Sequence, residues 1–332
     1  MNSQKQGRMI VFILGNGFDL AHGLKTRYTD FLAACCEEEL QNNIWFNYFN
    51  EKQKEIGENW FNLEREIYKV ITNERKDATS GGIPIYPNSS CIKSRFYAFF
   101  QSEQLVHHYV KIEKELYEGS KEHSLRFFVD QFGAYLREQL DDLNLTPKPK
   151  FQEFLKNGIL FNSRFLQYFS KIRIVNFNYT NTFEKLYNDT LHEEDGTLDI
   201  STYYIHGSLD KNNLVLGTQD LQNKEDPFRI FTKEYQILLY ETNKDYQEFL
   251  KELKETNKKS ITFHIIGHSL DEADHEILRS ILCYSGSENN NGDIKIYRYE
   301  GDDPFEKQRN IEKILQYGCN KRVSSTELKK II

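Results

Sequence analysis

A six-residue apolar run near the start of the chain, followed at once by glycines, constrains the fold more than any other feature. The run extends from Met9 to Leu14, and Gly15-Asn16-Gly17 ends it. A short, continuous apolar run is typical of a strand that is buried on both faces, as in a parallel sheet. A helix is expected next, as far as about residue 36. A strand, a glycine turn and a helix in this order open a Rossmann-type unit and predict an α/β fold.

The pattern changes after this first unit. From about residue 37 to residue 150, strand-like runs are lacking and apolar residues recur with helical spacing, most clearly from Leu125 to Leu143. Strand-like runs then return at Ile172–Phe177, Thr202–Ile205, Leu214–Leu216, Ile261–Ile266 and Ile294–Tyr299. Helices are expected at Asn181–Asn188, Lys233–Thr256, Ala273–Leu282 and Phe305–Tyr317. The sequence therefore predicts a Rossmann-like parallel sheet from residues 1–36 and 151–332, with residues 37–150 as a helical insertion.

Composition narrows the class of function. Of the 332 residues, 39% are hydrophobic and 14% aromatic, which is enough for a large core, and the net charge is −7. An acidic chain is poorly suited to binding nucleic acid or an anionic membrane surface. No stretch reaches the roughly 18 consecutive apolar residues of a membrane span. The five cysteines form no Cys-x-x-Cys pair, so we expect reduced thiols in a cytoplasmic protein, without a disulfide framework or zinc site.

Polar clusters follow several of the predicted strands, at the edge where open parallel sheets bind ligands. The first is Gly15-Asn16-Gly17-Phe18-Asp19. Glycines here let the backbone approach a pyrophosphate, and the following helix offers N–H donors. The third glycine of the dinucleotide fingerprint is missing. A plain strand-to-helix turn with an acidic residue near the helix start is therefore the alternative interpretation.

The second cluster, from Asn176 to Asn181, contains three amides and Thr180. Such polar side chains are costly to bury unless they bond to backbone or to a ligand. The strand alternation places Asn176 and Asn178 on one side. The alternative is that these side chains cap the helix that follows.

Two further clusters follow later strands. His206 stands at a strand end beside a glycine, where it can act as a general base near neutral pH, although a lone histidine can equally be structural. The last cluster runs from Gly267 to Asp274. Within it, Ser269 and Glu272 have the spacing of a capping box, which does not explain Gly267 or Asp274.

Other catalytic classes lack their signatures in this sequence. His264, His268 and His275 are close together, but they straddle a predicted strand and a turn, so we predict no metal site. A Gly-x-Ser-x-Gly motif is absent, which excludes an α/β-hydrolase nucleophile elbow. No glycine loop ends in Gly-Lys-Ser or Gly-Lys-Thr, which excludes a P-loop NTPase.

Several motifs resemble, in the same order, those of the bacterial abortive-infection AbiH-like family. They are Ile13–Leu24 with Tyr28–Leu32, then Asn176–Glu184, Ile205–Gly207, Leu216–Gly217 and Gly267–Asp274. The resemblance covers nearly the whole chain outside the helical insertion. It implies a role in defence against bacteriophage, usually by shutting down the infected cell.

A more distant resemblance is to sirtuin-like NAD-consuming domains. The residues at matching positions are Gly15, Gly17, Asn178, His206, Gly207, Gly267 and Ser269. Two positions depart from that pattern, because Asp19 replaces a serine and Thr180 replaces an aspartate. The four-cysteine zinc module of deacetylating sirtuins is absent, so protein deacetylation is not expected. Defence-associated relatives without that module hydrolyse NAD.

The two resemblances together imply an antiphage protein that cleaves NAD at its nicotinamide–ribose bond. Such a bond breaks through an oxocarbenium-like state. Asn178 would orient water or the ribose, and His206 would accept a proton from a ribose hydroxyl or from water. The other nucleotide contacts would come from the residues of the polar clusters, namely Gly15, Asn16, Gly17, Phe18, Asp19, Asn176, Thr180, Gly267, Ser269 and Asp274.

A non-catalytic alternative stays open from the sequence. In that interpretation the protein is a nucleotide-binding sensor, and the ligand switches a partner or an assembly. A homo-oligomer and a defence partner protein are the candidate partners, and the sequence does not decide between them, whereas a nuclease is disfavoured by the acidic charge and the lack of a metal set.

Overall fold

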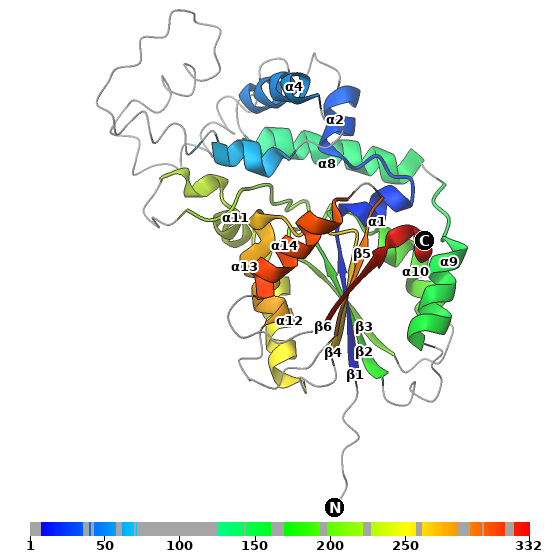
Figure 1. Cartoon of the computed structure of the whole chain (residues 1–332). Coiled ribbons are helices and arrows are strands. Elements are labelled where there is room, and N and C mark those ends of the chain that lie inside the picture. The colour runs from blue at the N-terminus through cyan, green and yellow to red at the C-terminus, as the bar shows by residue number, and fades with distance from the viewer. Residues whose placement is uncertain are drawn as a thin grey trace, which may run out of the picture. The chain divides into compact units, whose positions relative to one another are not determined.

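The structure is a computed structural model of the 332-residue chain (Figure 1). It describes residues 8–35, 40, 43–57, 62–69, 71, 125–142, 144–160, 169–192, 198–221, 227–256, 261–283, 293–300, 302–315 and 322–332. The chain divides into two compact units. The first comprises Met1–Thr26, Leu136–Asn213 and Glu241–Ile332, and the second comprises Arg27–Tyr135 and Leu214–Tyr240. The predicted insertion at residues 37–150 overlaps the second unit without sharing its boundaries.

The first unit contains a six-stranded parallel sheet with the order β3-β2-β1-β4-β5-β6. Its strands are β1 (Arg8–Leu14), β2 (Phe169–Asn176), β3 (Asp199–Tyr204), β4 (Ile261–Ile266), β5 (Asp293–Arg298) and β6 (Arg322–Glu327). This is the strand order of doubly wound dinucleotide-binding folds, and it confirms the predicted Rossmann-like α/β class. The order reverses between β1 and β4, which is the switch point where such sheets bind ligands.

Helices cover both faces of this sheet, as Figure 1 shows with the sheet nearly edge-on. One face carries α12 (Asn243–Glu255), α13 (His275–Leu282) and α14 (Pro304–Leu315), and the other carries α1 (Asn16–Ala21), α9 (Pro149–Glu153) and α10 (Thr182–His192). Successive side chains of a strand point to opposite faces of the sheet, which explains why a buried strand packs against helices on both faces. Met9, Val11 and Ile13 of β1 pack into one core, while Ile10 and Phe12 pack into the other.

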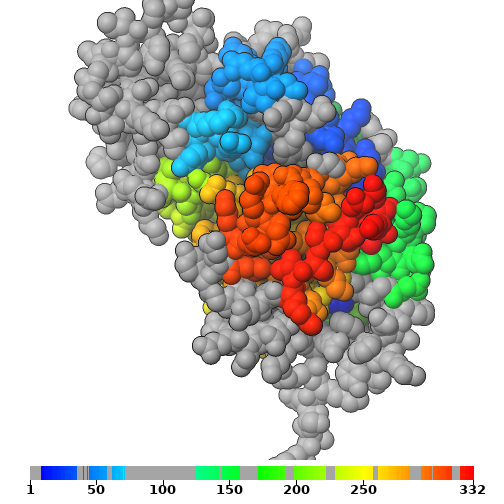
Figure 2. All heavy atoms as spheres, in the orientation of Figure 1, coloured from blue at the N-terminus to red at the C-terminus, as the bar shows by residue number. Residues whose placement is uncertain are grey.

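The last elements lie at the surface of the unit. Figure 2 shows the orange and red atoms of the C-terminal third, which includes α14 and β6, side by side on one face. The helix turns Ile311 and Ile314 toward the sheet, whereas Phe305 at its start is exposed. The helix expected at Phe305–Tyr317 is thus present as α14.

The second unit is helical in its described parts and has an aromatic core. It contains α2 (Tyr28–Ala34), α4 (Ile44–Ile56), a 3-10 helix at Pro227–Phe231, α11 (Lys233–Leu239) and the first part of α8 (Leu125–Asp142). Phe31 packs against Phe128 and Phe132, with ring centroids 5.4 and 5.2 Å apart. The helical stripe predicted from Leu125 onward is therefore confirmed as α8.

Some predicted elements differ from the structure for local reasons. The run at Leu214–Leu216 is not a strand, and its Leu216 N–H donates to the Gln236 side chain. The strand β6 was not predicted, because this edge strand is mostly polar and exposed and lacks an apolar run. The helix expected at Lys233–Thr256 divides into α11 and α12 at Glu241, whose φ of 55° is incompatible with a continuous helix.

The first predicted helix also divides. It ends at Ala21, and α2 begins at Tyr28. Gly23 lies between them in the left-handed region with a φ of 90°, and this conformation ends helices readily.

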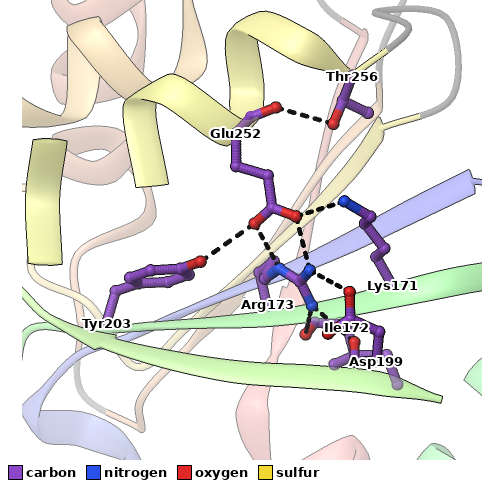
Figure 3. Close-up of polar contacts among 7 residues, drawn as sticks. All are labelled: Lys171, Ile172, Arg173, Asp199, Tyr203, Glu252 and Thr256. Atoms are coloured by element: carbon purple, nitrogen blue, oxygen red, sulfur yellow. Dashed lines mark hydrogen bonds and ion pairs between the residues drawn. The ribbon is translucent and has the colours of Figure 1, made fainter. Parts of the chain in front are cut away.

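An ion cluster around the buried Arg173 guanidinium joins α12 to the sheet (Figure 3). The Arg173 guanidinium donates from Nε and Nη2 to the two oxygens of Glu252 at 2.5 and 2.6 Å, and from Nη2 to Asp199 Oδ2 at 2.6 Å. Lys171 and Tyr203 also donate to Glu252, at 2.7 and 3.1 Å. The cluster thereby joins β2, β3 and α12. Lys171 and Asp199 lie near the starts of β2 and β3, Arg173 lies in the middle of β2, and Tyr203 lies near the end of β3.

The stability of the fold is expected to depend on the ionisation of Glu252 at low pH. Burial alone would raise the pKa of Glu252, but hydrogen bonds from Arg173 and Lys171 outweigh it and lower the pKa from 4.5 to about 2. A depressed folded-state pKa contributes stability that is complete above the unfolded-state value and is lost as pH falls toward the folded-state value. The free energy of unfolding should therefore fall between about pH 4.5 and pH 2.

Urea unfolding at a series of pH values tests this dependence. The Glu252→Gln variant cannot titrate at this position, so the stability difference between wild type and variant should shrink across that pH window. A difference that stays constant from pH 7 to pH 2 would contradict the assignment.

Candidate functional site

The predicted polar clusters meet at one edge of the sheet because the parallel strands end in register. Leu14 pairs with both Asn176 and Ile266, and Asn176 also pairs with Tyr204. The residues that follow each extend the ladder by one backbone hydrogen bond, from Gly15 to Ile266, Phe177 to Leu14, Ile205 to Asn176 and Gly267 to Tyr297. The turns after β1, β2, β3 and β4 thus start at the same level, all within the first unit.

The glycines after β1 and β4 let two turns pack directly against each other. The Gly17 N–H donates to the Gly267 carbonyl at 2.8 Å. A Cβ on Gly15 would lie 2.4 Å from His268 Cα, and a Cβ on Gly17 would lie 2.8 Å from Gly267 Cα. These distances leave no room for a side chain, which explains the glycines by close backbone approach. The pyrophosphate contact expected at this turn stays a prediction.

Replacing Gly267 by alanine is expected to destabilise the fold by roughly 2–3 kcal/mol, since strain and overpacking add. Its φ is 63°, and the new Cβ would lie 2.4 Å from the Phe18 nitrogen. Gly23 is the matched control, because its φ is 90° and nothing lies within 4 Å of its Cβ position. Gly23→Ala should cost only about 1 kcal/mol, from the backbone conformation alone. Equal losses in urea unfolding would contradict the close approach.

Side-chain hydrogen bonds stabilise the turn after β2 and join it to the turn after β1. Asn176 Oδ1 accepts from the Asn178 N–H, and its Nδ2 donates to the Thr180 carbonyl, both at 2.9 Å. These local bonds satisfy the Asn176 side chain within its own turn and do not cap α10, which begins at Thr182. Asn178 Nδ2 donates to the Gly15 carbonyl at 3.1 Å, and Thr180 Oγ1 donates to Asp19 Oδ2 at 2.6 Å. Asn178 and Thr180 therefore link two predicted clusters.

Asp19 is the most unusual of these residues electrostatically. Its side chain is 1% exposed. Burial is the main cause that raises the pKa of Asp19 to about 6, although the neighbouring polar side chains of Thr180, Thr182 and Asn178 lower it in part. Its Oδ1 atom makes no hydrogen bond in the part of the chain that the structure describes. A carboxyl group that titrates near neutral pH at a ligand-binding edge is typical of functional sites.

A second group of buried side chains gathers around Asp274. His206 Nε2 lies 3.0 Å from Asp274 Oδ1, an ion-pair distance without the alignment of a hydrogen bond. The other oxygen, Oδ2, lies 3.8 Å from His268 Nε2. The Phe177 ring stands perpendicular to both imidazoles, with centroids 5.1 Å from His206 and 4.5 Å from His268. The structure thus brings His206 and Asp274 together from separate predicted clusters.

Sequence reasoning missed His268 as a site residue. Its Nδ1 accepts the Leu270 N–H at 2.9 Å, so its neutral form carries the proton on Nε2, toward Asp274. The buried Lys307 ammonium donates to the His268 carbonyl at 2.5 Å and pairs with Asp302 at 3.2 Å. The one sequence feature that could have identified His268 was its position directly after Gly267. No sequence feature identifies Lys307, since it is a single lysine in the pattern of a surface helix.

The remaining predicted residues have other surroundings. The Asn16 side chain bonds to Thr26 through both of its polar atoms. The Phe18 ring packs in the core, 5.5 Å from Phe151. Ser269 is half-buried in the turn after β4. Its capping box is not formed, because the 3-10 helix Glu272–Asp274 begins after Asp271.

Other structural features bear on the class of protein. Among the residues that the structure describes, no three or more His, Cys, Asp or Glu side chains are grouped to hold a metal ion. In the same residues, no helix has the length and apolar character needed to cross a bilayer. Cys283 is disulfide-bonded, so the expectation of reduced thiols is wrong for this residue.

The sheet order and the position of the polar site define an open parallel α/β protein of the Rossmann type, with its candidate site at the switch point. The family model described as bacteriophage abortive infection AbiH matches residues 11–291. Because this match covers most of the chain, the protein belongs to the AbiH family, which confirms the resemblance in its motifs. Membership implies a role in antiphage defence by abortive infection. No curated protein matches the chain.

Proposed function

We propose that the protein acts in antiphage defence by cleaving NAD at the nicotinamide–ribose bond, with Asn178 and His206 as its catalytic residues. The observation that carries the proposal is the contact between buried His206 and buried Asp274 at the switch point of a Rossmann-type sheet. A histidine beside a carboxylate is a common arrangement for a general base, since the carboxylate orients the imidazole and stabilises its charged form.

The chemistry requires one proton acceptor and no external reductant or oxidant. The C1′–N bond breaks, and its electron pair stays on the pyridine nitrogen, so nicotinamide leaves as a neutral molecule. Water adds to C1′ and loses one proton, which leaves ADP-ribose. His206 accepts a proton from the ribose hydroxyl or from water. The Asn178 amide cannot titrate and serves to orient the reacting group.

The nucleotide is proposed to lie along the turns after β1 and β4, with its pyrophosphate near Gly15 and Gly17. In the present structure the N–H groups of these glycines donate to the carbonyls of Ile266 and Gly267. A pyrophosphate that used the Gly17 donor would therefore displace the Gly267 carbonyl. Asn176 and Thr180 support the site by fixing the turn that carries Asn178.

Measurements in infected cells test this function. Cells that carry the wild-type gene should lose NAD after phage challenge, and the phage should form fewer plaques on them. Cells that carry the His206→Ala variant should keep their NAD and should not be protected from the phage. Protection with an unchanged NAD pool would contradict cleavage. That outcome would favour the alternative, a nucleotide-binding sensor that switches a partner or an assembly.

A further inference from the structure

Asp19 is a buried carboxyl group at the candidate site that the proposed mechanism does not yet use. Thr182 Oγ1 donates to Thr180 Oγ1 at 3.1 Å, and Thr180 Oγ1 donates to Asp19 Oδ2 at 2.6 Å. Two hydroxyl groups thus form a chain that ends on one carboxyl oxygen. The other oxygen, Oδ1, is buried and makes no hydrogen bond in the described residues. Buried polar atoms of native proteins are nearly always satisfied, so such an atom calls for an explanation.

The surroundings of Asp19 disfavour its ionised form. Its pKa is raised to about 6, chiefly by burial and in smaller part by the Glu184 carboxyl group on α10, while Thr180, Thr182 and Asn178 act in the opposite direction. Glu184 is itself held by the Tyr204 hydroxyl at 2.8 Å, and burial raises its pKa as well. An asparagine at position 19 would fill the same space without this cost. A carboxyl group is therefore placed where structure alone does not need one.

Asp19 belongs to the same pair of turns as Asn178. The Asn178 side chain donates to the Gly15 carbonyl, and Asp19 follows in the first turn of α1. Asn178 is also among the side chains that favour the ionised form of Asp19. The carboxyl group and the orienting amide are therefore neighbours.

We propose that Asp19 accepts the proton of the water that attacks C1′ of the NAD ribose. This inference rests on the proposed function. As the C1′–O bond forms and the C1′–N bond breaks, the water proton moves to Asp19, and the electron pair of the broken bond leaves with nicotinamide. Asp19 then releases the proton to solvent. His206 is left to interact with the ribose hydroxyl.

The pH dependence of kcat for purified protein with NAD tests this assignment through two variants. Asp19→Asn should lower kcat by about two orders of magnitude or more, the usual size of a general-base effect, with KM within a few-fold. The acidic limb of the profile should disappear. Thr180→Val removes a hydrogen bond that favours the ionised form, so the acidic limb should move to higher pH. A merely structural role for Asp19 would not move that limb.

Thr190→Val is the matched control. Thr190 is a buried threonine of α10 whose hydroxyl accepts from the Gln152 side chain. The Thr190→Val variant should have its acidic limb at the same pH as the wild type. If the wild type cleaves NAD and Asp19→Asn keeps the same acidic limb, the Asp19 assignment is overturned and the proposed function stands. If the wild type cleaves no NAD, the proposed function fails first, and this inference fails with it.

Discussion

Replacing His206 by alanine is expected to lower NAD cleavage by about two orders of magnitude or more, because the imidazole is the proposed general base. Asn178→Ala should lose a comparable amount, since a misplaced reacting group is costly in rate. Both side chains are buried, and Asn178 gives up one hydrogen bond to Gly15. A lost hydrogen bond of this kind costs about 1 kcal/mol. Asn178→Ala should therefore still fold, with a melting temperature within several degrees of the wild type, and nicotinamide release by His206→Ala is compared per folded molecule.

His264→Phe is the control for a buried histidine outside the site. His264 lies in β4, stacks on Tyr297, and has its pKa lowered to about 3 by burial. It is therefore neutral, and an aromatic replacement should leave kcat unchanged. The measurement is nicotinamide release by purified protein. If His206→Ala keeps the wild-type rate while His264→Phe does not, the site is misassigned.

Replacing Arg173 by methionine is expected to lower the free energy of unfolding by about 3–5 kcal/mol, the usual cost of breaking a buried ion pair. The guanidinium is 3% exposed, and Glu252 and Asp199 both depend on it. Lys171→Met provides the comparison at the same carboxylate. Lys171 is 39% exposed, and exposed pairs contribute about 1 kcal/mol or less.

Urea unfolding at pH 7 measures both changes. We expect Arg173→Met to lower the free energy of unfolding clearly more than Lys171→Met does. Nicotinamide release per folded molecule should be unchanged in both variants. Similar small losses would mean that the cluster is not a main contact between α12 and the sheet. A loss of turnover without a loss of stability would instead place Arg173 in the reaction.

The strand ends and their polar clusters could be predicted from the sequence because a parallel sheet has only one ligand-binding edge. Once Met9–Leu14 is identified as a buried parallel strand, residues that follow the other strands must gather at the same edge. The positions of Asn178 and His206 at this edge of the sheet could be predicted in this way. The contact between His206 and Asp274 could not be predicted, since it depends on how two loops fold beyond their strands.

The parts that were not predicted lack a local pattern. The strand β6 is a polar edge strand, and the break between α11 and α12 depends on the single backbone conformation of Glu241. The contact between Asp19 and Thr180 also has no local sequence pattern from which it could be predicted. These two side chains lie far apart in the sequence and bond to each other only because the turns after β1 and β2 meet.

Product analysis of the purified wild-type protein with NAD tests the central claim most directly. We expect nicotinamide and ADP-ribose in equal amounts, and neither product from an Asn178→Ala, His206→Ala double variant. Release of nicotinamide mononucleotide and AMP would place the cut at the pyrophosphate instead. No turnover by wild-type protein isolated from phage-infected cells would contradict the enzymatic account altogether.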